Sequence, residues 1–521
     1  MKTRPPLTVG ARVKHPFLGP GSVLEVQRGG RVVRVCFDNK PTVAWLVVAA
    51  ELEKADEPAG MQAVMSALAL AHTHGVRNDK PLEQRRRKET VLLADDAETP
   101  LHVPHDLTEA QALHAVEALR LGVVPRHLIE TYTVGRQSEI AMVAQDLARS
   151  RTHGAFRVVM GDYGTGKTHH LEWVEEMALA QNFLTARVTL DAREVPPSMP
   201  KRVYRSIVRA LRYPNRTNGE AGGLAPLFDR ILENEALGTE LRDPQAETYH
   251  KYLSPALAYY ASLRDKDRGL VETLMDWVEG HPTVSNVVLD QRLKHHANRY
   301  HRLYALMDYC PWSHIYAYLL GGLSVMARRA GYSGLVLLLD EAEFYSLLSS
   351  GHAYYAAVLF SYYAAASAGL GGVKIDIDDL PRGGHAVHRA IPALYAPEQS
   401  LYVTFAITPE SAGVSVLRSL VPDEALVELS ALGAADYREL CGRVWGLYQH
   451  AYPEFTAPDA NLNRLGDALH RAIEWGRLGN VRQALKLLTE IADFMRHDPT
   501  HGSTFLRRCE EMLGASSVSL S

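Results

Sequence analysis

Five apolar runs in the central and C-terminal parts of the chain have the length and composition of buried strands. They cover residues 156–160, 183–190, 335–339, 401–408 and 425–430. A short apolar run bounded by turn residues is typical of a strand that is covered on both faces of a parallel sheet. Most of the sequence between these runs has helical periodicity. The alternation predicts an α/β protein built on a parallel sheet.

The first 52 residues have a different pattern. Three short β-branched runs, at residues 23–26, 31–37 and 43–48, alternate with turns rich in glycine, asparagine and proline. This spacing predicts a small antiparallel all-β barrel. Residues 1–50 contain eight basic and two acidic side chains, which gives this part of the chain a local net charge of +6.

Residues 161–168 have the signature of a phosphate-binding loop, with a predicted strand before it and a predicted helix after it. The loop consists of Gly161, Asp162, Tyr163, Gly164, Thr165, Gly166, Lys167 and Thr168. Its glycines let backbone N–H groups approach phosphates, and the helix N-terminus adds positive potential. Lys167 is predicted to reach the β- and γ-phosphates of ATP, and the Thr168 hydroxyl to ligate Mg²⁺.

Two acidic residues follow the most apolar of the strands. Asp340 and Glu341 come directly after the run Leu335–Leu339. At the carboxyl end of a central parallel strand, Asp340 is predicted to hold Mg²⁺ and Glu341 to activate the attacking water. The sequence therefore predicts that the chain hydrolyses ATP.

These motifs predict an α/β P-loop NTPase with an AAA+-like parallel sheet, a large helical insertion, a helical lid and the small N-terminal all-β barrel. A chain of 521 residues is long enough for two or three domains. We place the barrel at residues 1–52, a linker with a basic cluster at 53–105, the ATPase core at 106–430 and the lid at 431–521. The helical insertion occupies about 205–330 of the core.

Four further segments resemble parts of AAA+ ATPases. Thr408, at the end of a strand, fits the first sensor position, although it also fits a helix cap. Arg418 lies where such proteins place an arginine finger that reaches a neighbouring subunit, which would require a homo-oligomer. Arg482, in the segment GNVRQAL, resembles the second sensor of the lid, with an exposed helical arginine as the alternative. Val134, Gly135 and Arg136 resemble the segment that packs on adenine.

The longer pattern resembles the ATP-binding proteins of BREX-type phage-defence loci. The resemblance rests on residues 114–140, on GDYGTGKTHHLEW, LLLDEAE, TFAITPE and GNVRQALKLLTEI, and on the long gap between the second and third of these segments, and it spans about 110–510. It implies a role directed at DNA. Residues 8–52 resemble instead the Tudor/SH3-like barrels of some bacterial helicases. That resemblance implies docking to a helicase, nuclease or polymerase partner or to nucleic acid, with a solubilising cap as the alternative.

The insertion contains a basic, aromatic stretch at residues 291–312. Arginine, lysine and histidine side chains alternate there with tyrosines. A helix of this composition suits the grip of a nucleic-acid backbone, but it also suits the solvated face of an amphipathic helix. A zinc site at its histidines is disfavoured because no cysteine or carboxylate has suitable spacing.

Composition narrows the function further. The net charge of −4 excludes a global basic field, and the four scattered cysteines suggest free thiols in a reducing compartment. We expect a cytoplasmic protein without a membrane segment.

The predicted function is an Mg-ATP-hydrolysing ATPase that acts on DNA or a DNA-bound partner. The alternative is a slow ATP-dependent switch that recruits a helicase or nuclease. A small-molecule kinase is disfavoured because no acceptor pocket is evident.

Overall fold

The computed structural model divides into two compact units, Met1–Asp95 and Asp96–Ser521. It describes residues 107–123, 126–214, 222–282, 284–297, 300–342, 348–409, 412–455 and 462–514, together with the backbone of the N-terminal strands. The predicted linker, with its basic cluster at 85–88, lies outside the described residues.

The described part of the first unit consists of five short antiparallel strands. They are β1 (Arg12–His15), β2 (Gly19–Gln27), β3 (Val32–Phe37), β4 (Ala44–Val48) and β5 (Glu53–Lys54), and they pair in the order β4-β3-β2-β1-β5. The register of β2 against β3 shifts between Val23 and Glu25. The closed barrel and its docking role remain predictions.

A six-stranded, mostly parallel sheet forms the centre of the second unit. Its strands are β6 (Ala155–Met160), β7 (Leu184–Thr189), β8 (Leu211–Arg212), β9 (Leu335–Asp340), β10 (Leu401–Ile407) and β11 (Leu426–Glu428). The order across the sheet is β11-β6-β10-β9-β7-β8, and only β8 runs antiparallel to its neighbour. Each of the five predicted apolar runs matches one of the parallel strands to within one or two residues at each end, so a mixed α/β fold is confirmed.

Side chains of the central strands alternate between two hydrophobic cores. In β9, Leu335, Leu337 and Leu339 face one core, whereas Val336 and Leu338 face the other. Successive strand side chains point to opposite faces. Helices α11 (Ser313–Arg329) and α12 (Ser350–Ala368) contribute to the first core, and α3 (Gln137–Ser150) and α4 (Lys167–Ala180) to the second. The sheet is therefore buried on both faces, which explains its continuous apolar runs.

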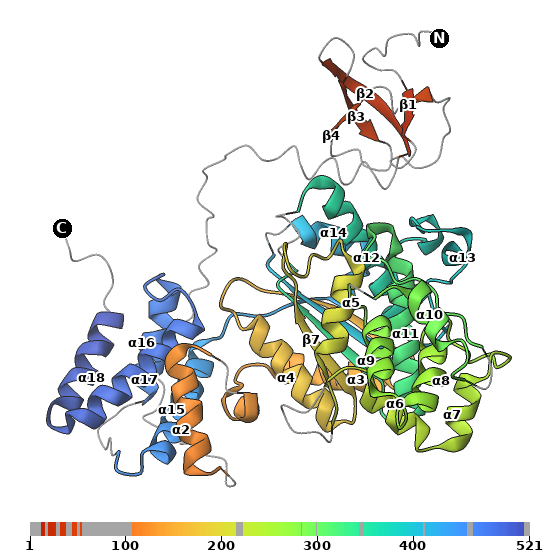
Figure 1. The fold of residues 1–521 in the computed structure, drawn as a ribbon. Helices are drawn as coiled ribbons and strands as arrows, with labels where there is room; N and C mark the ends of the chain where they lie inside the picture. The colour runs from red at the N-terminus through yellow and green to blue at the C-terminus, as the bar shows by residue number, and fades with distance from the viewer. Residues whose placement is uncertain are drawn as a thin grey trace. The chain divides into compact units, whose positions relative to one another are not determined.

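The insertion between β7 and β9 is largely helical, as the sequence predicts (Figure 1). It contains α5 (Pro200–Arg209), α6 (Ala225–Leu232), α7 (Glu235–Arg242), α8 (Leu253–Leu263), α9 (Arg268–Val278), α10 (Asn286–Leu293) and the short η4 (Cys310–Trp312) before α11. The prediction of a basic helix over 291–312 is wrong, because α10 ends at Leu293 and residues 300–309 are not helical. The carboxylate of Asp290 instead accepts hydrogen bonds from Leu303 N, at 2.9 Å, and from Tyr300 Oη, at 2.5 Å, and so fixes this segment against α10.

The segments that flank β10 and β11 are mostly short helices. They are η6 (Leu370–Gly372), η7 (Ile377–Asp379), α13 (Ala386–Arg389), α14 (Ala412–Leu420) and η8 (Asp423–Ala425). The first three lie between α12 and β10, in the stretch 369–398.

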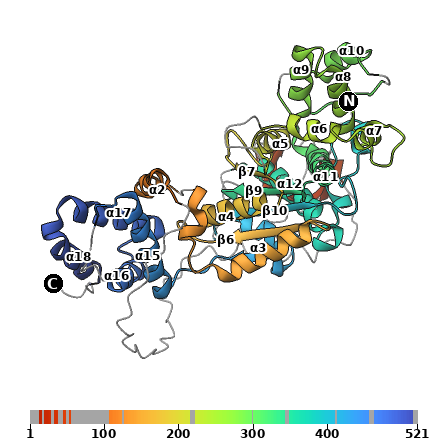
Figure 2. The same ribbon diagram turned by 90° about the horizontal axis from the view of Figure 1, so that it is seen from below.

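The C-terminal helices form a bundle that includes one helix from before the sheet. The bundle contains α15 (Ala434–Ala451), α16 (Leu462–Glu474), α17 (Val481–His497) and α18 (Pro499–Gly514), and α2 (Glu109–Leu121) packs against α15 and α17 (Figures 1 and 2). Arg120 of α2 donates to Asp493 Oδ2 at 2.7 Å and to Tyr452 Oη at 3.1 Å. From the sequence pattern alone, α2 falls within the predicted ATPase core at residues 106–430.

Two further sequence expectations concern membranes and thiols. Among the described helices, none combines the length and the apolar character that crossing a bilayer requires. Cys310, Cys441 and Cys509 are free cysteines, and the last two are buried.

Candidate functional site

The loop between β6 and α4 has the backbone conformation that its glycines permit. Gly164 and Gly166 have φ angles of 85° and 101°, in the region that disfavours side chains. A Cβ atom at Gly161 would lie 2.4 Å from Thr165 Oγ1. The three glycines of the signature therefore allow a compact loop at the carboxyl edge of the sheet and at the N-terminus of α4.

The ammonium group of Lys167 is held beside this loop. It donates to Gly161 O at 2.7 Å, to Asp162 O at 3.3 Å and to Thr408 Oγ1 at 3.3 Å. Thr408 directly follows β10, the strand that pairs with both β6 and β9. The topology thus places the predicted sensor residue next to the predicted phosphate-binding lysine.

The predicted metal ligands contact one another. Thr168 Oγ1 donates to Asp340 Oδ2 at 3.1 Å, and Asp340 Oδ1 accepts from Glu341 N at 2.9 Å. A hydroxyl and a carboxylate oxygen match the hard oxygen ligands that Mg²⁺ prefers. The pairing of Thr168 with Asp340 therefore fits a magnesium site.

Glu341 has an unusual backbone. Its φ angle is 57°, and it is exposed, whereas Asp340 is buried. A left-handed conformation is costly for a residue other than glycine and is often found at functional sites. The chain therefore leaves the buried strand at Glu341, which is an exposed residue directly after the buried Asp340.

Arg136 contacts the phosphate loop itself. Its buried guanidinium donates to Thr165 O at 2.8 Å and to Ser430 O, beyond β11, at 2.7 Å. It also pairs with Glu139 at 3.2 Å. The side chain thus links the loop to the end of β11 and to α3.

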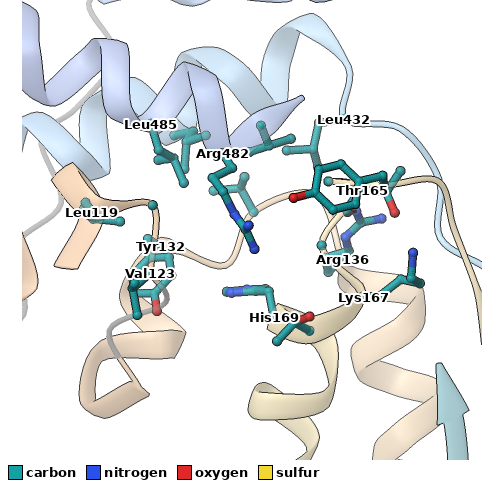
Figure 3. Close-up of a pocket in the computed structure, with 18 of the residues that line it drawn as sticks. Leu119, Val123, Tyr132, Arg136, Thr165, Lys167, His169, Leu432, Arg482 and Leu485 are labelled. Atoms are coloured by element: carbon teal, nitrogen blue, oxygen red, sulfur yellow. Dashed lines mark hydrogen bonds between the residues drawn. The ribbon is translucent and has the colours of Figure 1, made fainter. Parts of the chain in front are cut away.

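A cavity of about 230 Å³ extends from the phosphate loop to the helical bundle. Figure 3 shows Lys167, Arg136 and Thr165 towards one end, and Leu119, Val123 and Tyr132 towards the other. Leu432, Leu440, Val481 and Leu485 complete its apolar lining. A polar end beside a helix N-terminus and an apolar end are the two environments that the phosphates and base of a nucleotide require.

His169 lies between these two ends. Its Nε2 is 2.8 Å from Thr133 Oγ1, and its ring centroid is 5.4 Å from that of Tyr132. Burial, together with the neighbouring His170 and Arg136, lowers the pKa of His169 to about 4. The imidazole is therefore neutral at pH 7 and presents a flat, uncharged wall to the cavity.

The lid contributes a cation and a close contact. Arg482 lines the cavity, and its side chain points towards His169 (Figure 3). A Cβ atom at Gly164 would lie 2.2 Å from Asn480 Cβ, and one at Gly122 would lie 2.8 Å from Arg482 Cγ. The N-terminus of α17 therefore packs directly on the phosphate loop and on the end of α2.

The other predicted site residues differ in position. Val134 lines the cavity, whereas Gly135, with φ 63°, lies against the carboxylate of Asp436. Tyr163 lines the cavity but is 74% exposed. Arg418 lies on the exposed face of α14 and outside the cavity.

Sequence reasoning missed most of the apolar wall. Leu119, Gly122 and Val123 come from the end of α2, and Leu432, Leu440 and Leu485 from more than 300 residues later. No local pattern marks these residues, because packing of the bundle brings them together. His169 could have been identified from the sequence, because it directly follows Thr168, the last residue of the phosphate-binding signature.

Comparison with known proteins supports this assignment of the loop. No curated protein matches the chain. A family model matches residues 107–248, a range that includes α2, the phosphate loop and the first helices of the insertion, whereas Asp340, Thr408 and Arg482 lie outside it. Over residues 107–248 the chain is similar to the family described as BREX system ATP-binding protein BrxC/D.

Proposed function

We propose that the chain is an Mg-ATP-hydrolysing, AAA+-like ATPase that acts on DNA or a DNA-bound partner in phage defence. The observation that carries the proposal is the meeting of Lys167, Thr168, Asp340 and Thr408 at one edge of the parallel sheet. The order β11-β6-β10-β9-β7 brings these side chains together from the ends of two neighbouring strands, β9 and β10, and from the N-terminus of α4. The family match to ATP-binding proteins supports ATP as the ligand.

Mg-ATP, when bound, supplies the γ-phosphoryl group that water attacks. Lys167 would exchange its loop carbonyl partners for phosphate oxygens, and Thr168 and Asp340 would hold the metal ion. Glu341 would orient a water molecule and accept its proton. Arg482 would reach the phosphates from the lid, so that bound nucleotide would hold the lid against the loop.

Steady-state ATP hydrolysis by the purified full chain tests the proposal. We expect Glu341→Gln to retain ATP binding and to lose at least 100-fold in turnover, because the water loses its base. Lys167→Ala should weaken ATP binding at least tenfold. Glu490→Gln changes an exposed glutamate of α17 and serves as the matched control. Undiminished binding and hydrolysis in Lys167→Ala would exclude the proposed site.

The same assay separates the two modes of action. Turnover that single- or double-stranded DNA stimulates, and that Glu341→Gln abolishes, supports an ATPase directed at DNA. Slow turnover that DNA does not change supports the switch that recruits a helicase or nuclease. Cross-linking with and without ATP then tests whether Arg418 completes the site of a neighbouring copy.

A further inference from the structure

A basic and aromatic surface is assembled from two segments distant in sequence, one in the insertion and one outside it. The first is described at residues 292–297 and 300–309, and the second, residues 385–389, contains α13 and lies between α12 and β10. We call this surface the insertion face, and its exposed members are Arg292, Lys294, His295, His296, Tyr300, Arg302, Tyr309, His385 and Arg389.

Contacts among the described residues hold the two segments together. Asn286 Nδ2 donates to Leu303 O at 3.2 Å, which fixes the non-helical segment against α10. The Tyr304 ring lies 6.5 Å from that of His388 in α13, and the Arg302 guanidinium lies 5.4 Å from the Tyr304 ring centre. Trp312 and His388 also have ring centroids 4.5 Å apart. These contacts join α13 to residues 302–312, the part of the insertion face that contains Arg302 and Tyr309.

Its acidic residues are already engaged. Asp290 accepts from Leu303 N and Tyr300 Oη, and Asp308 pairs with Arg202 at 2.8 Å. The arginine and lysine side chains of the face are exposed, on a chain whose net charge is −4. A local positive surface on an otherwise acidic protein fits a polyanion.

Exposed aromatic rings indicate which kind of polyanion the insertion face would bind. Tyr300 is 50% exposed and Tyr309 is 55% exposed, whereas most tyrosines of the insertion are buried. Exposed rings next to cations are the means by which proteins stack unpaired bases while they hold the phosphate backbone. Paired bases in a duplex do not present their faces for such stacking.

We propose that the insertion face binds single-stranded DNA. Arg292, Lys294 and Arg302 would contact phosphates, and Tyr309 would stack on a base. The inference deepens the proposed function and rests on it, because it names the surface and the form of DNA on which that ATPase would act.

Fluorescence anisotropy with the full chain and a labelled 20-nucleotide oligo-dT tests the phosphate contacts. The triple variant Arg292→Glu/Lys294→Glu/Arg302→Glu should bind at least tenfold more weakly. The slope of log K for binding against log salt concentration should become shallower by about two, because each of the three lost phosphate contacts accounts for about 0.7 on a single strand. The control triple Arg149→Glu/Arg471→Glu/Arg508→Glu changes the net charge equally at exposed sites elsewhere and should bind like the wild type. Equal losses in both triples, or none in the first, would overturn the proposal.

Tyr309→Ala tests stacking separately from charge. It should weaken oligo-dT binding about tenfold without a change in salt slope, and Tyr309→Phe should restore binding. A 20-base-pair duplex should bind more weakly than oligo-dT. Equal duplex binding together with no effect of Tyr309→Ala would overturn the single-strand assignment.

Measurements of ATP binding distinguish a failure of the DNA-binding proposal from a failure of the proposed ATPase function. The Arg292/Lys294/Arg302 variant should bind ATP like the wild type, and Lys167→Ala should bind oligo-dT like the wild type. Loss of oligo-dT binding in Lys167→Ala would contradict a separate DNA surface. Wild-type ATP binding in Lys167→Ala would remove the proposed ATP site and leave the DNA result intact.

Discussion

Arg136 joins three segments of the chain through one buried guanidinium, which donates to Thr165 O, Ser430 O and Glu139. A hydrogen bond that involves a charged group contributes about 1.5–3 kcal/mol, and loss of the arginine would also leave Glu139 without its cation. We expect Arg136→Ala to weaken ATP binding at least tenfold in a titration with a fluorescent analogue. Arg136→Lys should recover only part, because an ammonium lacks the guanidinium fork. Arg149→Ala is the exposed control, and unchanged affinity in Arg136→Ala would contradict the role.

Thr408 is a second residue whose role the geometry makes testable. Its hydroxyl lies 3.3 Å from Lys167 Nζ. Thr408 follows β10, which lies between β6, the strand before the phosphate loop, and β9, the strand that ends at Asp340. We expect Thr408→Ala to keep ATP affinity within about threefold and to lower turnover about tenfold, because one polar contact near the γ-phosphate is lost. Thr408→Ser should retain turnover. Single-turnover hydrolysis measures the effect, and wild-type rates in Thr408→Ala would favour the role of a helix cap.

The polar half of the candidate site was predictable from the sequence, and the apolar half was not. Residues 161–168 and Asp340 are short, local signals whose chemistry depends on adjacent strands and helices. Leu119 and Leu485 are ordinary apolar residues of amphipathic helices, and only tertiary packing places them at one cavity. The contacts of Arg136 with backbone carbonyls have no sequence signature at all. The parallel strands were predictable because a strand buried on both faces is continuously apolar.

At the scale of elements, the N-terminus of α17 and the phosphate loop fit closely together. Asn480 caps α17 by accepting from Gln483 N at 3.1 Å, and its side chain leaves no room for a Cβ atom at Gly164. Gly164→Ala should therefore displace the lid, strain the loop, whose φ is 85° there, and weaken ATP binding at least tenfold. Asn480→Gly in the same chain should recover part of this loss. A double-mutant cycle with ATP titrations measures the coupling, and strict additivity would contradict the direct contact.

Helix α2 is attached to the bundle by a partly buried ion pair. Arg120 contacts Asp493 of α17, and this contact lowers the pKa of the Asp493 carboxyl although burial opposes it. Arg120→Ala should lower the free energy of unfolding by about 1–3 kcal/mol, because the partly buried Asp493 carboxylate loses the guanidinium and keeps the Tyr448 hydroxyl as its donor. Hydrogen exchange of α2 should rise more than that of α3. Equal exchange in both helices would show that α2 does not depend on this pair.

The whole second unit buries several histidines in its two hydrophobic cores. Burial lowers the pKa of His170 and of His314 to about 4, and that of His250 to about 3. The His250 Nδ1 accepts from the backbone N–H groups of Tyr252 and Leu253, at 3.1 and 3.0 Å, so its protonation would break both bonds. The fold thus holds these rings in the neutral form.

A histidine with a lowered pKa in the folded state makes stability depend on pH in one direction. In the unfolded chain these three buried histidines take up protons near pH 6.5, whereas in the folded chain they do so only near pH 3–4. Their contribution to stability is therefore fully present above pH 6.5 and is lost as the pH falls towards 4. For His250 alone, the loss at pH 4.5 is about 2–3 kcal/mol.

The midpoint of thermal unfolding, followed by tryptophan fluorescence from pH 7.5 to 4.5, should fall steeply below pH 6.5. His250→Asn keeps an acceptor for the two N–H groups but does not titrate, so its decrease should be shallower, whereas the exposed His153→Asn should behave like the wild type. A wild-type midpoint that stays constant across this range would contradict the neutral state of the buried histidines.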